Sequence, residues 1–575
     1  MLRIFTPSLL LGATLCFGQA GTTATMPATS ATTPNTFKDQ AIDPEYPRWG
    51  TKAYMRTIFR QDTPKFELQG PVQLQDHVAG GKLELSLKSF LELVLNNNTD
   101  IQIQRLTLET PKNAVTRAFS IFDPQFNARF SSTRTKTPTT DALAGAAVLS
   151  TLNQPVNLNW QQFMPTGTQF TASYGANKNS TNNSFANFNP AFGSNLNVGF
   201  TQNLWRARDR EVIRTPITIA KTRVRATEFQ FQDQLQTLLT NAENAYWDVV
   251  GARENLKVQE QALGLADASL KRAQRELELG ALPALEIYQP QAVYARAEIL
   301  VTQARYRLAQ TEDALRRQIG IDLDPDLRKL PIVLTEDVLP ATDNKSIDKE
   351  ALVAEAVRIR PDVQVQREQL NIDDLTLRQT SDNLRPNFQL FGNYSIQGRG
   401  GPVVQRQTIF NPDGTTSPIT AIIPGGFNDA LSQMFGFGFP VIGGGVQLFL
   451  PIRDRNASAN YADAVVSKRL DQLRLRSLEQ NVRLDVLNAI NQVENSRASV
   501  DLARIAADLA QKRVEADQKR YELGTITLFF LLDSQNALTQ AQSDLVNQSV
   551  QYRRNLLNMY RRAGTLLIQR GISTN

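Results

Sequence analysis

One short stretch of this chain occurs twice. It reads Thr99-Asp100-Ile101-Gln102-Ile103-Gln104-Arg105 at its first occurrence and, 262 residues later, Pro361-Asp362-Val363-Gln364-Val365-Gln366-Arg367. This separation is far longer than the roughly 20–50 residues of a solenoid repeat. We therefore interpret the chain as a duplicated half-molecule, and not as an array of short repeats.

Two further segments repeat at similar offsets. Pro124-Gln125-Phe126 returns as Pro386-Asn387-Phe388, again 262 residues on, and Glu278-Leu279-Gly280 returns as Glu522-Leu523-Gly524, 244 residues on. The difference between the two offsets implies an insertion or deletion inside the unit. Two similar halves commonly lie side by side around a shared axis, so we expect the function to be located on that axis.

The composition is that of a folded protein. Hydrophobic residues make up 41% of the 575 residues and charged residues 21%, and the net charge is +6. Lys and Arg are interspersed with Asp and Glu, whereas binding to nucleic-acid phosphates requires clustered positive charge. We therefore expect no nucleic-acid partner.

The first 20 residues have the pattern of a secretory signal peptide. Arg3 supplies the positive charge, residues 9–17 form a short apolar core, and Gly18-Gln19-Ala20 offers small residues to a signal peptidase. Cys16 is the only cysteine, and Leu15 before it disfavours a lipid anchor. Cleavage after residue 20 would leave a chain without thiols, whose stability must come from packing.

After the signal, the sequence contains no run of 18 or more apolar residues and so predicts no transmembrane helix. An exported protein of this kind is either soluble outside the cytoplasm or spans a membrane as a β-barrel. These are the alternatives because only helices and closed barrels satisfy the backbone polar groups in lipid.

Each half begins with a predicted helix, over residues 83–120 and 346–383, and then changes to the period of a β-strand. Residues 126–130, 388–396 and 446–450 alternate between apolar and polar side chains, which predicts strands with one apolar and one polar face. Short alternating strands with long polar loops are typical of outer-membrane barrels. A soluble sandwich would show the same alternation.

Each half continues with a very long predicted helix, over residues 215–279 and 456–523, about 100 Å long at ~1.5 Å per residue. Apolar residues at spacings of three and four, many of them alanine, predict close supercoiled packing. The chain then turns at a glycine into a return helix of half that length, over residues 284–318 and 528–562. Half-length helices stacked end to end would pair along each long helix, giving a rod with strands at one end and glycine turns at the other.

In this order and duplication, the elements resemble the TolC family of outer-membrane efflux proteins over about residues 81–565. The sharper motifs are Leu83-Glu84-Leu85-Ser86-Leu87 with Asn96-Asn97-Asn98, the tips Leu279-Gly280 and Leu523-Gly524-Thr525, and the junction Leu450-Pro451-Ile452-Arg453-Asp454. The resemblance implies an α+β membrane protein built as a homotrimer. Its strands would jointly form a transmembrane β-barrel in the cell outer membrane, and its helices a coiled-coil α-helical barrel with a long periplasmic extension.

The resemblance further implies the exit duct of a tripartite efflux or type I secretion system. Conduction would be passive, and the partners would be a periplasmic adaptor protein and an inner-membrane transporter. The expected organisation is a signal peptide (1–20), an N-terminal leader that is partly disordered (21–80), a first efflux repeat (81–330), a connecting segment (331–347), a second efflux repeat (348–565) and a C-terminal tail (566–575).

The resemblance also assigns roles to residues at the tips. Those expected to dock the adaptor are Leu279, Gly280, Leu523, Gly524 and Thr525. In the family pattern the sixth residue after the tip glycine is acidic, and Glu286 fills that position in the first half. Phe530 stands there in the second half, and Asp533 is the acidic residue three positions further on. Glu286 and Asp533 are therefore the expected aperture residues, in a reduced acidic ring.

Two features depart from the family pattern. Asn203, in Gln202-Asn203-Leu204-Trp205, stands where the family usually has proline. Alternating runs at 156–174, around the turn signal Pro165-Thr166-Gly167, exceed the usual two strands per half. They form either an extracellular hairpin, which we favour, or strands that widen the barrel. Trp160 and Trp205 belong either to an interfacial aromatic belt or to packing inside the barrel.

No residue pattern supports catalysis, a cofactor or a metal. His77 is the only histidine, so the sequence offers no His/Cys cluster for zinc and no triad away from that residue. No glycine-rich phosphate loop follows a predicted strand. We therefore expect that the protein is not an enzyme. The alternative to the efflux duct is a soluble periplasmic coiled-coil scaffold without channel activity.

Overall fold

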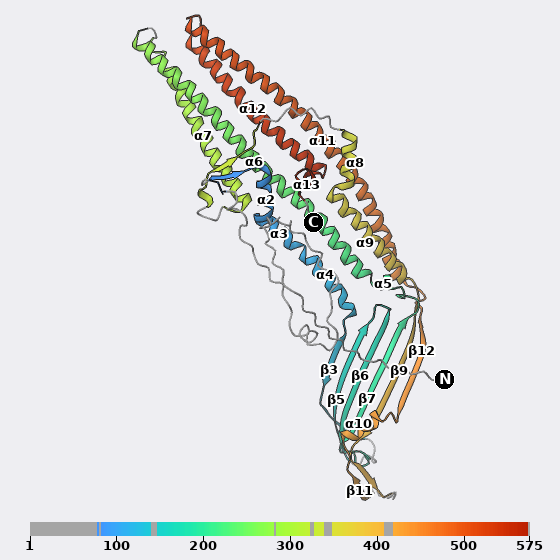
Figure 1. Ribbon diagram of the computed structural model, residues 1–575. Helices are drawn as coiled ribbons and strands as arrows, with labels where there is room; N and C mark the ends of the chain where they lie inside the picture. Colours follow the sequence, from blue (N-terminus) through green and yellow to red (C-terminus); the bar gives the residue numbers. More distant parts are fainter. Residues whose placement is uncertain are drawn as a thin grey trace, which may run out of the picture. The chain divides into compact units, whose positions relative to one another are not determined.

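The structure is a computed structural model that describes residues 78–79, 82–139, 146–280, 283–321, 327–338, 348–407 and 418–572. The expected signal peptide with Cys16, nearly all of the leader, and His77 lie outside the described residues. Within the described part, the two halves repeat one series of elements: short helices, strands, one long helix and one return helix (Figure 1).

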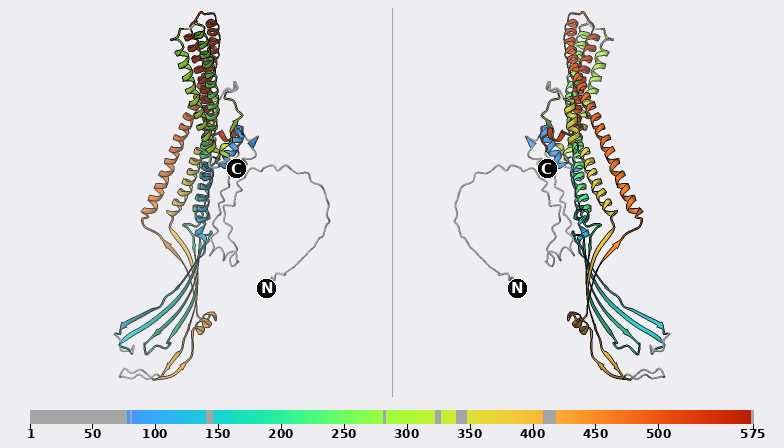
Figure 2. Two further views of the ribbon diagram at one scale, coloured as in Figure 1. Left: turned by 90° about the vertical axis from the view of Figure 1, so that its left-hand side faces the viewer. Right: turned by 90° about the vertical axis from the view of Figure 1, so that its right-hand side faces the viewer.

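The long helices and their return helices lie where the sequence predicts them. The first half has α6 (Thr215–Glu278) with 64 residues and α7 (Tyr288–Ile319) with 32. The second has α11 (Arg455–Glu522) with 68 residues and α12 (Leu528–Arg562) with 35. Each return helix is therefore half as long as the helix that it follows, as predicted. The hairpins α6–α7 and α11–α12 run side by side (Figures 1 and 2), and α12 packs on α6.

The short helices occupy the other half of each long helix. In the first half α4 (Glu109–Phe119) packs on α6, where Val115 is fully buried against Ala220 and Val224. In the second half α8 (Lys349–Ile359) and α9 (Pro361–Asn383) pack on α11, and α9 also packs on α6. The predicted pairing of half-length helices along the long ones is thus confirmed.

The two predicted helices over 83–120 and 346–383 are wrong as continuous helices. The first is a strand, β2 (Lys82–Leu85), followed by α2 (Leu87–Asn97), α3 (Thr99–Thr107) and α4. Asn98 interrupts it because its side-chain oxygen accepts hydrogen bonds from the backbone of Asp100 (2.9 Å) and Ile101 (3.2 Å), which caps a new helix. The second breaks at Arg360 because Pro361 disfavours helical dihedrals in the residue before it.

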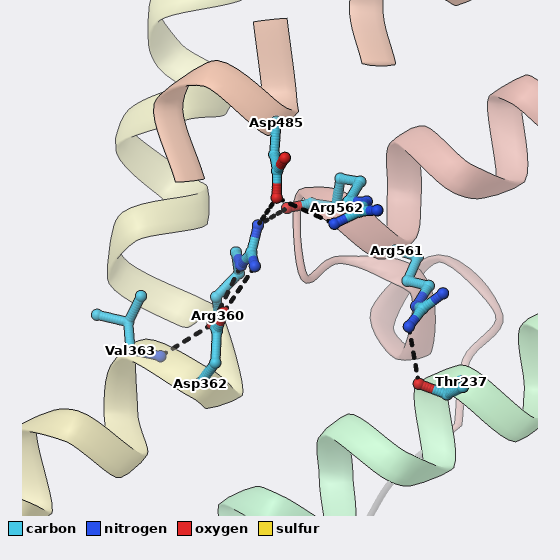
Figure 3. A network of polar contacts seen from close by, with 7 residues as sticks. All are labelled: Thr237, Arg360, Asp362, Val363, Asp485, Arg561 and Arg562. Carbon is cyan, nitrogen blue, oxygen red and sulfur yellow. Dashed lines mark hydrogen bonds and ion pairs between the residues drawn. The ribbon is translucent and has the colours of Figure 1, made fainter. Parts of the chain in front are cut away.

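A buried arginine joins the helices at this second break (Figure 3). The guanidinium of Arg360, only 13% exposed, pairs with Asp362 at 2.6 Å and with Asp485 of α11 at 3.6 Å, and donates to the carbonyl of Arg562 at 3.3 Å. One side chain therefore holds together α9, α11 and the end of α12. In the first half the matching place is bridged by Asn98, whose amide donates to the carbonyl of Gln318 at the end of α7.

We expect Arg360→Ala to lower the free energy of unfolding by about 2–4 kcal/mol, because Asp362 and a helix-terminal carbonyl lose their partner and Asp485 keeps only its 3.0 Å pair with Arg562. Denaturant unfolding of the purified protein measures the change. Arg358→Ala is the matched control, since Arg358 lies on the exposed side of the same helix end, and should cost less than about 0.5 kcal/mol. Equal effects of the two substitutions would contradict the assigned role of Arg360.

The main sheet combines strands of both halves, in the order β12-β9-β7-β6-β5-β3, with β4 also pairing with β5. All its pairs are antiparallel. The strands are β3 (Gln125–Phe130), β4 (Thr133–Pro138), β5 (Val148–Phe163), β6 (Thr168–Thr181), β7 (Ala191–Asn203), β9 (Asn387–Gly400) and β12 (Pro440–Phe449). The strands predicted at 126–130, 388–396 and 446–450 are confirmed.

The favoured interpretation of residues 156–174 as an extracellular hairpin is wrong. β5 and β6 are interior strands of the main sheet, paired on both sides. Their connecting turn lies at the end of the sheet where the helices begin. Gly167, in this turn, lies so close to α5 (Arg210–Ile213) that an added Cβ would be 3.0 Å from the carbonyl of Ala207 and from Ile213. Alternation predicted the strands but could not predict their partners.

Smaller elements lie beside the middle of α6 and at the end of the main sheet far from the helices. β1 (Val78–Ala79), β2 and β8 (Ile332–Leu334) form a small sheet, and β10 (Val403–Arg406) pairs with β11 (Ile419–Ile423). α10 (Phe427–Phe435) packs on β9 and β7, so closely that a Cβ on Gly398 would clash with the carbonyl of Ala430. The remaining pieces are α13 (Leu566–Gln569) and the 3-10 turns η2 (Ser120–Phe122) and η4 (Leu327–Lys329).

Candidate functional site

The main sheet has one apolar and one polar face, and the pairing register carries each face across all its strands. Phe126 pairs with Trp160, Trp160 with Ala172, Ala172 with Val198, Val198 with Tyr394 and Tyr394 with Ile442. Even-numbered residues therefore share one face. Many of their side chains are strongly exposed, among them Phe126, Phe130, Ile442 and Val446 at 62–79%. A wide exposed apolar face of this kind marks a surface that contacts another protein or a membrane.

The opposite face carries uncharged polar groups. The row Gln125, Gln161, Thr171, Gly199, Asn393 and Gly443 is one example. In the described strands of the main sheet, the charged residues at odd-numbered positions are Arg129 and Arg399. A hollow of about 590 Å³ lies over this face and is lined by Asn127, Asn159 and Ser173 among others. The sheet thus separates a water-compatible surface from an apolar one.

The two tryptophans differ in position. Trp160 lies on the apolar face, in edge contact with Phe170 at a centroid distance of 5.6 Å. Trp205 follows β7, is 53% exposed and touches Phe388 edge-on at 6.4 Å. Their membership of an aromatic belt stays a prediction. Among the described residues, no helix is both long enough and apolar enough to cross a membrane.

The helix tips repeat the same turn in both halves. Gly280 and Gly524 adopt positive φ angles of 73° and 70°, which glycine allows without a steric penalty. Their amides donate to the carbonyls of Leu277 (3.0 Å) and Tyr521 (2.9 Å). A Cβ at either glycine would meet nothing within 4 Å. The glycines are therefore needed for the turn, and the space around them is open in this chain.

The tips expose apolar side chains. Of the predicted docking residues, Leu279 is 83% and Leu523 78% exposed, and the hydroxyl of Thr525 donates to the carbonyl of Arg520 at 2.9 Å. Further exposed residues beside them, which sequence reasoning did not assign, are Leu285, Tyr288, Phe529 and Phe530. The surface formed by these six apolar side chains and the two glycines is called the tip surface below.

A tyrosine links the two hairpins just behind the tip surface. The hydroxyl of Tyr521, on α11, donates to Glu276 of α6 at 2.6 Å. The guanidinium of Arg272 lies over the Tyr521 ring at 4.8 Å, pairs with Glu276 at 3.1 Å and reaches Glu522 at 3.7 Å. We call this set of four residues the tip link. Burial and the neighbouring carboxylates raise the pKa of Tyr521 to about 12, so the hydroxyl stays a donor at neutral pH.

The predicted aperture residues occupy different places. Asp533 of α12 pairs with Arg513 of α11 at 3.5 Å, inside the second hairpin. Glu286 lies in the turn before α7, and its backbone donates to the carbonyl of Pro283. Its neighbour Ile287 belongs to the buried cluster that joins the first hairpin to α12, and its charge contributes to the raised pKa of Tyr521. The structure thus brings Glu286, and not Asp533, towards the contact between the hairpins.

Sequence reasoning missed the tip link. Glu276 and Tyr521 lie three or four residues before the tip glycines, at positions where the halves differ: Arg520 matches Glu276, and Leu277 matches Tyr521. A comparison of the two halves, position by position, could have indicated these residues, because each differs in charge or in its hydroxyl group from its counterpart in the other half. The contact itself joins residues 245 apart and needs the tertiary structure. In the described residues, no group of three or more His, Cys, Asp or Glu could hold a metal ion.

A carboxyl pair is buried between α9 and α11. Asp373 is 7% and Asp471 6% exposed, and Asp471 is paired with Arg474 at 2.8 Å. Gln369 donates to Oδ1 of Asp373, whereas its Oδ2 is buried without a partner among the described residues. Burial first, and then the neighbouring Asp471, raise the pKa of Asp373 to about 6.

The raised pKa makes stability depend on pH. Because folded Asp373 binds its proton more tightly than an unfolded aspartate, the free energy of unfolding falls as the pH rises from about 4 through about 6. Asp373→Asn should remove this slope and raise the free energy of unfolding at pH 7 by about 1–2 kcal/mol. Urea unfolding at pH 5 and pH 8 measures both effects. Asp267→Asn, which breaks an exposed pair with Lys271, is the control and should leave the slope unchanged.

Comparison with known proteins gives one consistent result. The sequence matches the family model described as "Outer membrane efflux protein" over residues 90–321 and 352–565. It is similar to the Outer membrane protein TolC of Escherichia coli (strain K12), with 21% identity over 370 residues, 64% of this chain and 67% of that protein. The fold is similar to the CmeC outer membrane channel of Campylobacter jejuni (TM-score 0.57, 15% identity, covering 88% of this chain and 94% of that one). It is also similar to the open state of the MtrE outer membrane channel of Neisseria gonorrhoeae (TM-score 0.53, 15% identity, 88% and 98%).

Proposed function

The chain belongs to the outer membrane efflux protein family, the family of TolC, and is an outer-membrane efflux channel protein. On this basis we propose that it is the passive exit duct of a tripartite efflux or type I secretion system. Three copies would form one tunnel. The main sheet would form the wall in the outer membrane, and the helices would extend into the periplasm. A periplasmic adaptor protein would dock at the tip surface and connect the duct to an inner-membrane transporter.

The two faces of the sheet support this placement. An apolar face without charge from Phe126 to Phe130 and from Phe388 to Ile396 suits lipid, and the amide-rich opposite face suits a water-filled lumen. In the described residues, β12 pairs only with β9, and β3 and β4 only with β5. Backbone groups at such edges cannot remain unpaired in lipid. Pairing the β12 edge of one copy with the β3–β4 edge of the next closes the wall without a free edge.

The long helix α11 supports assembly with further copies. Its exposed apolar residues are Val465, Val466, Leu470, Leu473, Leu484, Leu502, Ile505 and Leu509. Exposed apolar side chains repeated along one helix indicate an interaction surface, and identical copies in a closed ring cover such surface symmetrically. Because one surface of each copy then meets a different surface of the next, the contact gives a closed ring when the rotation between neighbouring copies divides a full turn, and we propose that this ring has three copies.

Opening would act on the tip link. The link holds α11 to α6 at the end where the tunnel would be narrowest, and Glu286 adds a carboxylate beside it. Adaptor binding to the exposed leucines of the tip surface would favour a state in which the two hairpins separate and the Tyr521–Glu276 hydrogen bond is broken. A ligand can shift such an equilibrium only through its preference for one state.

The observation that carries the proposal is the uncharged apolar band of the sheet combined with its two open edges. The native mass of the protein extracted from membranes, with and without detergent, tests it. We expect a particle of three chains that needs detergent to stay in solution. A monomer or dimer released without detergent would overturn the proposal and favour the coiled-coil scaffold, which the family match does not favour.

A further inference from the structure

We propose that β5 and β6 are full membrane-spanning strands of the duct wall, so that each copy contributes six strand positions and a closed trimer has about eighteen. This inference rests on the proposed trimeric duct. Two strands per half would give only twelve. The extra hairpin would widen the outer-membrane lumen by about half, since barrel diameter grows roughly linearly with strand number. The duct would then pass bulky hydrophilic cargo.

The hydrogen-bonding register makes β5 and β6 part of the wall. The pairing of β5 with β6 extends from Thr151–Thr181 to Phe163–Gln169, and that of β6 with β7 from Thr168–Gln202 to Asn179–Ala191. These ladders are as long as the ladder between β7 and β9, the strands that join the two halves. β3 and β4 pair with β5 in one register, from Gln125–Gln161 to Pro138–Val148. They therefore act as one strand position, and the count of six follows from the sheet order.

The extra strands are long enough and correctly placed to cross a membrane. β5 has 16 residues and β6 has 14, whereas a tilted transmembrane strand needs about 9–11. The turn at Gly167 lies against Ala207, next to the start of the helices. The turn of this hairpin therefore lies at the same end of the sheet as the strand-to-helix junctions, and both of its strands cross the sheet to the opposite end.

The side chains of β5 and β6 continue both faces of the wall. Even positions are apolar from Val156 to Trp160 and from Phe170 to Ala176, and odd positions over the same stretches are polar or glycine. A flap in water on both sides would not need an uncharged apolar face. The basic residues at even positions, Arg134, Lys136 and Lys178, lie beyond this apolar band, away from the helices. That is where long basic side chains reach polar headgroups.

The lumen face explains the class of cargo. Across β5 and β6 the odd positions supply Asn157, Asn159, Gln161, Thr171, Ser173 and Asn177, none of which is charged. Amide and hydroxyl groups hydrate well and exchange hydrogen bonds with a polar solute without selecting for its charge. A wide lumen with this lining admits large hydrophilic solutes, whereas a charged constriction would select among small ions.

Single cysteines at two positions of β6 test the wall directly, because the chain has no cysteine after Cys16. We expect Ala172→Cys to react with a lipid-soluble maleimide only, and Ser173→Cys with a small water-soluble one. Val198→Cys and Asn197→Cys on β7 are the matched controls, since these residues pair with Ala172 and Ser173. Reaction of Ala172→Cys with a membrane-impermeant reagent, while Val198→Cys stays protected, would overturn the inference and leave the duct intact. Reaction of both Ala172→Cys and Val198→Cys with the membrane-impermeant reagent would overturn the proposed duct itself.

The width is tested by a size series of polyethylene glycol maleimides applied from outside the cell to Asn197→Cys. We expect the full chain to admit larger reagents than a variant that lacks residues 146–183, in which β5 and β6 are deleted. Equal size limits in the two proteins would overturn the widening. Where the deletion variant does not assemble, the size limit of the full chain is compared with that expected for twelve and for eighteen strands, and a limit at the narrower value overturns the inference.

Discussion

We expect Gly524→Trp to abolish efflux while leaving the proposed trimer intact. Gly524 has a φ of 70° and open space around it, so the substitution costs about 1–2 kcal/mol of local backbone strain and creates no clash inside the chain. The indole instead occupies the tip surface, beside the exposed Leu523. Loss of one central contact of about 2 kcal/mol weakens binding of a partner roughly 30-fold, and the adaptor could no longer connect the duct to its transporter.

The measurement is the restoration of efflux in a cell that lacks its own duct, together with the trimer content of its membranes. Gly571→Trp is the matched control, because Gly571 also has a positive φ, of 66°, and open space for a Cβ, but lies at the far end of α13. It carries the same backbone strain and should retain full efflux. Unchanged efflux in Gly524→Trp would remove the docking role from the tip surface. Loss of trimers in both variants would assign the effect to folding.

The tip turns were predictable because their signals are local. Glu-Leu-Gly appears at the end of both long apolar patterns, and glycine is the residue that tolerates the left-handed turn each hairpin needs. The helix lengths followed from the same signals, and α12 runs from Leu528 to Arg562 as predicted. The docking roles of Leu279, Gly280, Leu523, Gly524 and Thr525 stay predictions, because docking depends on a partner.

The errors concern places where local signals compete or where partners are distant. Asn98 sits inside an apolar periodic pattern, and only its capping hydrogen bonds show that it starts a new helix. Alternation located the strands at 156–174, but the partners of a strand depend on the edge that the rest of the chain presents. The same holds for the tip link, in which Tyr521 takes the place of a leucine in the first half and finds Glu276 on another helix.

Tyr521→Phe should open the duct without an adaptor. The substitution removes the hydrogen bond to Glu276 but keeps the ring beneath Arg272, so the packing of α11 against α6 is retained. A hydrogen bond to a charged group contributes about 1.5–3 kcal/mol, and its loss shifts a closed–open equilibrium by roughly 10- to 100-fold towards the open state. Conductance of the purified protein in a planar bilayer measures this shift, and Tyr306→Phe, at an exposed tyrosine of α7, should leave it unchanged.

The pH dependence identifies the bond responsible. Because the pKa of Tyr521 is raised to about 12, the hydroxyl donates throughout the neutral range, and the link is lost only as the pH rises through about 12. Conductance of the parent channel should therefore stay low up to about pH 10, the pKa of an ordinary tyrosine. The double variant Tyr521→Phe with Glu276→Leu should open the channel by less than the sum of the two single effects, because the hydrogen bond between these side chains can be lost only once. A parental conductance in Tyr521→Phe, or fully additive effects of the two substitutions, would show that the hairpins are held closed by other contacts.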